Sequence, residues 1–134
     1  MIRKTAEVDL PSIKALMQSI PGFWHEAWTD EALEKALAAA GDMALVYEAD
    51  GQIVGFTFCH DLGFRAYVSE LAVADDMRGR GIGKQLLEEV ERILKERGCE
   101  LIIVDAWKSA LPFYKALGWT EPDVVLLRKQ LASP

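Results

Sequence analysis

The chain has 134 residues, of which 51% are hydrophobic and 27% charged, and its formal net charge is −6 at pH 7. This length suits a single domain over residues 1–134, and the composition is too apolar for a disordered protein. The negative charge argues against a nucleic-acid partner, because such partners require a basic surface. No apolar run approaches the roughly 18 residues of a membrane span, and no signal-peptide pattern follows Met1. We therefore expect a cytoplasmic protein without a membrane partner.

The charge is unevenly distributed along the chain. Residues 1–76 carry 5 basic and 13 acidic side chains, whereas residues 77–134 carry 10 basic and 8 acidic ones. An acidic half beside a mildly basic half suits a cationic partner on one side and an anionic partner on the other. The alternative is an acidic surface that serves only solvation.

The first half of the chain predicts one short strand, two helices and three further strands. Asp9 is suited to cap the first helix, and Gly41 to end the second. An Asp-Gly turn at 49–52 predicts a hairpin, and Gly55 suggests a bulge in its return strand. We expect strands over 2–5, 43–47, 53–60 and 65–73. The first helix is expected over 10–20, and the second, capped by Thr29 or Asp30, is expected to continue to residue 40.

The second half predicts a long helix that follows the loop 74–80, has Ile82 as the first residue of its apolar stripe and is closed by Gly98. Leu101–Val104 is an almost uninterrupted apolar strand, which is typical of burial on both faces. A short helix over 110–117 and a last strand over Val124–Leu127, with Leu131 as its furthest limit, complete the order. This order predicts an α/β fold with a mixed sheet, in which an antiparallel meander, a crossover helix and a parallel neighbour follow one another.

The chain has two cysteines, Cys59 and Cys99, which are too few for a disulfide framework or a metal site. Neither histidine has a second ligand at metal-binding spacing, so we expect no metal. Both cysteines flank apolar segments and are expected to be buried free thiols.

Residues Arg78–Lys84 form a glycine-rich turn between a strand and a long helix. Three glycines permit positive φ and let a bulky anion approach the main chain. The first N–H groups of the helix point outward without partners and attract negative charge, and three cations lie among them. The turn therefore predicts a pyrophosphate site. It lacks the spacing of a Walker A loop and of a Rossmann dinucleotide loop.

Glu70–Val73, followed by Arg78-x-x-Gly81-x-Gly83, resembles the acetyl-CoA motif of the GNAT superfamily of N-acetyltransferases. Ala110–Trp119, about 30 residues later, is similar to the family's second motif, an Ala followed by Phe-Tyr and Gly-aromatic. The resemblance spans residues 2 to about 131. It implies a mostly antiparallel sheet whose fourth and fifth strands are parallel and splayed apart, with helices on both faces.

The resemblance also implies how acetyl-CoA is held and used. The pyrophosphate would lie on the main chain from Arg78 to Lys84, and the pantetheine arm would pair with Leu71 and Val73 as an extra strand. An amine would attack the thioester directly, without an acyl-enzyme. The implied cofactor-binding residues are Leu71, Ala72, Val73, Arg78, Gly79, Arg80, Gly81, Ile82, Gly83 and Lys84.

Two residues match catalytic positions of the family. Tyr114 would protonate the leaving thiolate, because a phenol with a pKa near ~10 is protonated at neutral pH; the alternative is a core aromatic residue. Glu70 would draw the proton from the amine; the alternative is a solvent-facing strand carboxylate. Trp107 stands where many members carry an Asn that contacts pantetheine, so that contact is lost or moved.

The acceptor pocket is expected beside residues 21–30. Phe23, Trp24 and Trp28 would line it as an aromatic wall, unless they only pack on the core. The acidic first half favours a cationic small-molecule or peptide amine. Family habit predicts a homodimer through the C-terminal strands. The competing functions are a catalytically silent acyl-CoA-binding domain and an interaction module that binds through the aromatic loop.

Overall fold

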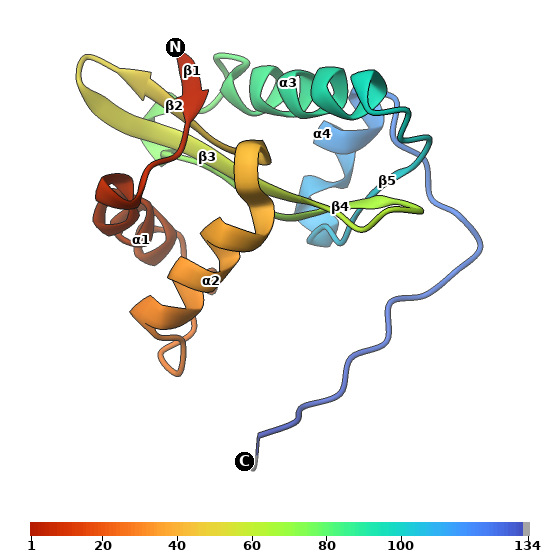
Figure 1. Ribbon diagram of the computed structural model, residues 1–134, viewed down its shortest axis with the longest axis horizontal. Coiled ribbons are helices and arrows are strands. Elements are labelled where there is room, and N and C mark those ends of the chain that lie inside the picture. Colours follow the sequence, from red (N-terminus) through yellow and green to blue (C-terminus); the bar gives the residue numbers. More distant parts are fainter. Residues whose placement is uncertain (133–134) are drawn as a thin grey trace. The chain divides into compact units, whose positions relative to one another are not determined.

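The computed structural model describes residues 1–132 and shows a five-stranded mixed sheet with the strand order β1-β2-β3-β4-β5 (Figure 1). All neighbours pair antiparallel except β4 and β5, which are parallel. The expected sheet is therefore confirmed. The strands are β1 (Ile2–Lys4), β2 (Ala44–Ala49), β3 (Gln52–Asp61), β4 (Ala66–Val73) and β5 (Ile102–Val104).

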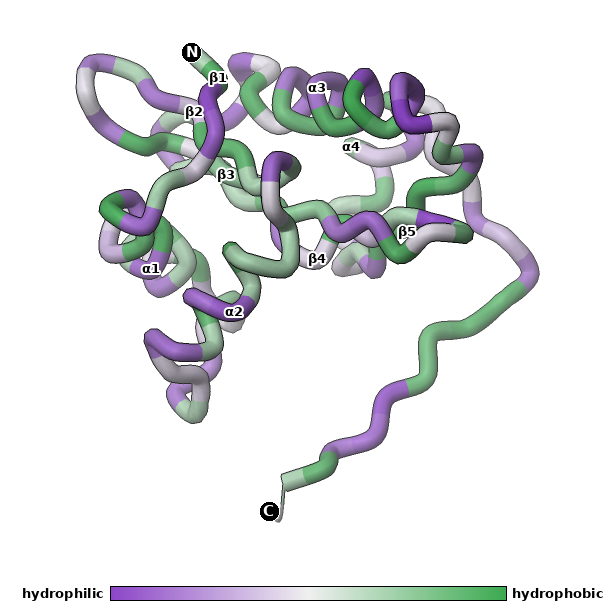
Figure 2. Tube along the Cα trace, in the orientation of Figure 1, coloured by the Kyte–Doolittle hydropathy of each residue, from purple (hydrophilic) through white to green (hydrophobic). Residues whose placement is uncertain are grey.

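Helices cover both faces of this sheet, as predicted (Figure 1). On one face, α1 and α2 enclose a core with Phe56 and Phe58, whose rings meet edge to face at 5.2 Å. On the other face, α3 packs the buried side chains of Leu86 and Val90 against the strands, while its polar residues face outward (Figure 2). The helices of this part are α1 (Leu10–Ser19), α2 (Asp30–Ala40) and α3 (Ile82–Glu96).

The chain divides into two compact units, Met1–Val104 and Asp105–Pro134. The second unit contains a 3-10 turn at Lys108–Ala110 and the short helix α4 (Leu111–Ala116). No helix within residues 1–132 combines the length and the hydrophobicity that a bilayer crossing requires.

The predicted last strand is wrong. Residues Val124–Leu127 form no regular secondary structure and have no strand partner in the described part of the chain, and their side chains are 64–85% exposed. Strand propensity shows only that a segment fits a pleated sheet, and a strand forms only when its main chain is paired.

Three local expectations also change. Asp9 does not cap α1; its carboxylate accepts from the Ala6 N–H at 2.7 Å and pairs with Arg3. The bulge of the β2–β3 pair falls at Val54 rather than at Gly55. Ile103 is 37% exposed rather than buried on both faces, since β5 is an edge strand.

Candidate active site

The turn before α3 has the geometry expected of an anion site. Gly79 and Gly81 adopt φ of 78° and 77°, in the left-handed region that favours glycine. The Gln85 N–H donates to the Gly81 carbonyl at 3.0 Å and starts the helical ladder. No side chain of the described residues caps the helix, so the amides of Ile82, Gly83 and Lys84 are available to a ligand.

Three cations surround this turn, and all are exposed. Arg78 and Lys84 make only long contacts of 3.8 Å, with Asp75 and Glu88 respectively. Surface pairs of this kind contribute little, so both side chains can turn toward an anion. The positive end of the helix dipole adds to their attraction.

Strand β4 has an open edge directly before this turn. It pairs with β5 only from Ala66 to Val68, where the last register pair is Val68 with Val104. β4 continues for five more residues to Val73, about 16 Å at roughly 3.3 Å per residue. From Leu71 to Val73, the described residues provide a strand partner only on the β3 side.

A bulge in β4 decides which main-chain groups face this open edge. The register of β3 and β4 shifts between Phe58 and Cys59, which leaves Ser69 as the extra residue. The Ala74 N–H bonds to the Val54 carbonyl at 2.8 Å. Because bonding residues alternate along an antiparallel pair, Leu71 and Val73 direct their main-chain groups away from β3.

Two side chains of β3 contact the bulge of β4 on the side away from its open edge. The Thr57 hydroxyl donates to the Glu70 carbonyl at 2.7 Å, and His60 Nε2 lies 2.7 Å from the Ser69 hydroxyl. Burial lowers the pKa of His60, which keeps its ring neutral and able to accept this bond at neutral pH. These polar contacts connect β3 to the bulge of β4. Glu70 itself is half-buried on β4.

Tyr114 belongs to the second unit, where it lies on α4. Its ring meets Phe113 and Trp119 edge to face, with centroids 5.0 and 5.4 Å away. Burial, assisted by Asp105, raises the pKa of Tyr114 to about 12. The phenol is therefore protonated at every physiological pH.

The aromatic residues between α1 and α2 divide into two groups. Phe23 and Trp24 are half-buried and pack against the core, as in the packing alternative. Lys14 Nζ lies 5.3 Å from the Trp24 ring, and Trp28 meets the same ring edge to face at 5.6 Å. Of these three aromatic residues, Trp28 alone is exposed, at 40%, and offers an aromatic surface to a ligand.

The cysteines offer no competing chemistry. Cys59 is buried in β3, and burial raises the pKa of its thiol to about 12, far from that of a reactive thiolate. Cys99 is half-buried, and its Sγ lies 3.4 Å from the Leu101 carbonyl oxygen. Within residues 1–132, no three His, Cys, Asp or Glu side chains gather into a potential metal site.

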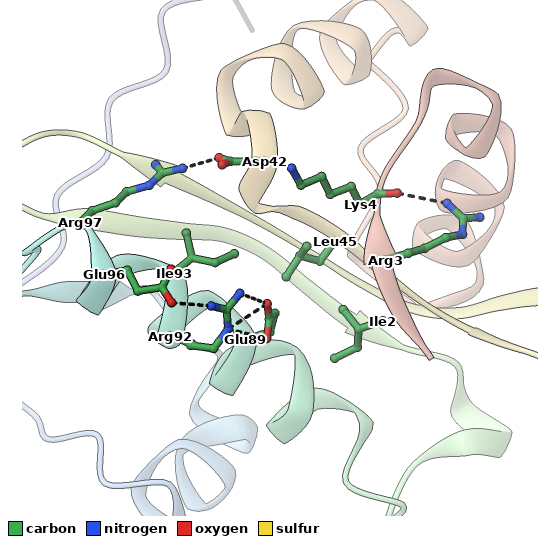
Figure 3. Close-up of a pocket in the computed structure, with 10 residues that line it drawn as sticks. All are labelled: Ile2, Arg3, Lys4, Asp42, Leu45, Glu89, Arg92, Ile93, Glu96 and Arg97. Carbon is green, nitrogen blue, oxygen red and sulfur yellow. Dashed lines mark hydrogen bonds and ion pairs between the residues drawn. The ribbon is translucent and has the colours of Figure 1, made fainter.

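A separate shallow pocket of about 510 Å³ lies between β1 and the C-terminal half of α3 (Figure 3). Two of its arginines pair with carboxylates of the same pocket. Arg92 bonds Glu89 at 2.6 Å and Glu96 at 2.8 Å. Arg97 pairs with Asp42 at the rim. The pocket lies at the opposite end of α3 from the glycine-rich turn and has no part in the site described above.

Most of the chain matches one known protein family. Residues 12–119 match the model of the acetyltransferase (GNAT) family. The chain belongs to the GNAT family of acetyltransferases. An acetyltransferase of Pectobacterium atrosepticum is 32% identical over 111 residues, which cover 81% of this chain and 77% of that protein.

Other relatives agree with this assignment. An uncharacterised N-acetyltransferase of Prochlorococcus marinus is 28% identical over 84% of this chain, which spans only 63% of its length. The crystal structure of Ard1 from Thermoplasma volcanium shares the fold at 20% identity, with a TM-score of 0.80 over 90% of this chain and 82% of that one. An aminoglycoside acetyltransferase from a soil metagenome, solved with sisomicin, is 25% identical, with a TM-score of 0.73 over 98% of this GNAT chain and 96% of its own.

The predicted binding residues from Leu71 to Lys84 thus form one continuous segment of the GNAT domain. Sequence reasoning missed the contacts between β3 and the bulge of β4, in which Thr57 meets Glu70 and His60 meets Ser69. Polar residues in an otherwise apolar strand were the available signal at Thr57 and His60, but the strand pairing was needed to show which residues they meet.

Proposed function

We propose that this protein transfers an acetyl group from acetyl-CoA to a primary amine. The observation that carries the proposal is the continuity of two features. The open edge of β4 ends at Val73, and the uncapped start of α3 follows after residues 74–81, which include a 3-10 turn at Asp75–Met77. A pantetheine arm and a pyrophosphate follow one another in CoA in the same way.

The two features recognise different parts of the co-substrate. The amides from Arg78 to Lys84 bind the pyrophosphate, with Arg78 and Arg80 adding charge. The main-chain groups of Leu71 and Val73 bond to the amides of the pantetheine arm, which thereby adds a strand beside this part of β4.

The proposed reaction is a direct attack of the amine on the thioester carbon. The carbonyl oxygen gains negative charge and is stabilised by the Leu71 N–H. When the C–S bond breaks, the thiolate takes the proton of the Tyr114 hydroxyl. The surplus proton of the amine passes to Glu70, directly or through water. A Lys-like amine must first lose a proton at a cost of roughly 4–5 kcal/mol at pH 7, so a base is needed.

The high thiol pKa of Cys59 supports this direct route over an acyl-enzyme, because a buried neutral thiol is a poor nucleophile. For the acceptor, we propose a cationic small-molecule or peptide amine. The acidic first half of the chain and the likeness to an aminoglycoside acetyltransferase support this class. Trp28 would contact the acceptor through its exposed face.

The test is release of free CoA thiol from acetyl-CoA in the presence of a panel of amines, with binding of acetyl-CoA measured by calorimetry. We expect micromolar binding and amine-dependent thiol release. Binding of acetyl-CoA without release of thiol in the presence of any amine would favour a catalytically silent acyl-CoA-binding domain. The presence of Trp107 where many family members carry Asn is also compatible with that function. Absence of binding would overturn the proposal.

A glycine substitution tests the site itself. Gly81→Glu places a carboxylate in the anion site and should abolish acetyl-CoA binding in calorimetry. The matched control is Gly98→Glu, because Gly98 has the same φ of 77° and open space around it at the other end of α3. Both variants carry the same backbone strain, so equal loss of binding would count against the site.

A further inference from the structure

Gly55 lies on β3, outside every segment assigned to the binding site above. It is buried, and a Cβ built on it would lie 2.9 Å from Ile82 Cγ2 and 3.4 Å from Leu86 Cδ1. Carbon atoms in proteins prefer separations of about 3.5–4.0 Å, so the first of these contacts is a clash. Gly55 therefore permits the start of α3 to lie closer to the sheet than any other residue type would allow.

Rotating the Ile82 side chain would relieve the clash only at a cost in energy. Ile82 is β-branched, and such a residue has one strongly preferred χ1 rotamer in a helix. Ile82 is also the first residue of α3 and only 3% exposed. An added methyl group at position 55 must therefore shift the first turn of the helix, including the amides that Ile82 and Gly83 present to a ligand.

The same Cβ would also meet β4. It would lie 3.3 Å from the carbonyl oxygen of Ala72, tighter than ordinary contact. Ala72 stands between Leu71 and Val73, the two residues whose main-chain groups face the open edge. A side chain at position 55 would therefore contact both parts of the proposed site, the start of α3 and strand β4.

We propose that Gly55 is a positioning residue for acetyl-CoA, because its missing side chain sets the place of the α3 amides relative to the β4 edge. The inference rests on the proposed function. Its specific content is that affinity for the co-substrate depends on the contact between residues 55 and 82, beyond any effect on folding.

The experiment is a double-mutant cycle between Gly55→Ala and Ile82→Ala, read as the Kd of acetyl-CoA by calorimetry on the full chain. With Ile82 in place, we expect Gly55→Ala to raise the Kd about ten-fold, since sub-ångström misplacement of binding groups is costly. In the Ile82→Ala background, where Cγ2 is absent, the same change should raise the Kd less than two-fold. Loss of the side chain at 82 makes room for the new methyl group.

Val90→Ala is the matched control for general destabilisation. Val90 is a fully buried residue two turns further along α3, and its truncation creates a cavity without approaching the first turn. Its melting temperature should fall while the Kd stays within two-fold of wild type, at a temperature where all variants are folded. Should Gly55→Ala alone prove unfolded, all four members of the cycle are compared in trimethylamine N-oxide, an osmolyte that favours the folded state.

The outcomes separate the two claims. If the unmodified chain does not bind acetyl-CoA, the proposed function fails. If it binds, and Gly55→Ala leaves the Kd unchanged or weakens binding equally in both backgrounds, Gly55 has only a structural role and the inference is overturned.

Discussion

Burial shifts the acid–base behaviour of three side chains in directions that bear on the proposed chemistry. It raises the pKa of Tyr114 to about 12 and that of Cys59 to about 12, and it lowers the pKa of His60. In each case burial disfavours the charged form. The phenol is thus kept as a proton donor, the thiol is kept unreactive, and the imidazole is kept neutral behind β4.

Tyr114→Phe removes the proposed proton donor while keeping the ring contacts with Phe113 and Trp119. We expect kcat to fall about 100-fold, within the usual range for loss of a general acid, with the Kd of acetyl-CoA within two-fold of wild type. Steady-state kinetics and calorimetry measure the two quantities. Tyr47→Phe, at a half-buried tyrosine on β2, is the control and should leave both unchanged. An unaltered kcat in Tyr114→Phe would remove Tyr114 from the mechanism.

His60 predicts a pH dependence of stability. Its folded pKa lies below the ordinary value near 6.5, so between these two values the unfolded chain binds more protons. The stabilisation from neutral His60 is therefore complete above about pH 6.5 and is lost as the pH falls through the folded pKa. Urea unfolding at pH 7.5 and pH 5.0 should show a smaller loss for His60→Gln than for wild type.

The control for this measurement is His25→Gln, at an exposed position between α1 and α2. It should lose as much stability between the two pH values as wild type does. Identical losses in wild type and His60→Gln would show that protonation of His60 does not destabilise the fold.

At the scale of elements, the two ends of α3 differ in how far their polar groups are already paired. Its start leaves amides uncapped and cations loosely paired, whereas its last turns lie among tight ion pairs of Arg92 and Arg97. Of the two ends, the first is the one suited to accept an anion. The arginines of the pocket in Figure 3 already pair with carboxylates, so they are poorly placed to bind a ligand.

Charge reversal at the two ends of α3 should therefore have different effects. Arg80→Glu should raise the Kd of acetyl-CoA about five- to ten-fold at low salt, because it adds a repulsive charge where the helix dipole favours an anion. The effect should shrink in about 0.5 M salt, where the screening length is short. Lys95→Glu makes the same change in charge in the last turn and should leave the Kd unchanged. Equal effects would mean that only net charge matters.

At the scale of the whole molecule, the second unit carries both Tyr114 and an exposed apolar segment. Val124–Leu127 are 64–85% exposed, and Figure 2 shows this stretch as hydrophobic. Contiguous exposed apolar residues mark interaction surfaces. The homodimer expected from the resemblance would bury this segment.

Light scattering on the purified chain tests that expectation. We expect the mass of a dimer for wild type and of a monomer for Leu127→Asp, which puts a charge into the apolar segment. Lys129→Asp alters charge in the same segment without removing an apolar side chain and should remain dimeric. A monomeric wild type would refute the prediction.

Much of the fold follows from local patterns. Apolar periodicity predicts the helices within a few residues of their observed bounds, and glycine spacing identifies the turn at Arg78–Lys84. These features depend on residues close together in the chain. The missing strand at Val124–Leu127, the exposure of Ile103 and the bulge at Ser69 depend on neighbours far away in the sequence, so no local pattern predicted them.

By itself, the sequence determined the order of the elements as far as α4, the glycine-rich turn at Arg78–Lys84 and the resemblance to the acetyltransferases, because glycine conformation and side-chain periodicity are local properties. Only the tertiary structure decided which main-chain groups of β4 face the open edge, and why Gly55 must lack a side chain. Strand register and the approach of a helix to a sheet arise from the packing of distant segments, and a single residue of shift reverses what an edge presents.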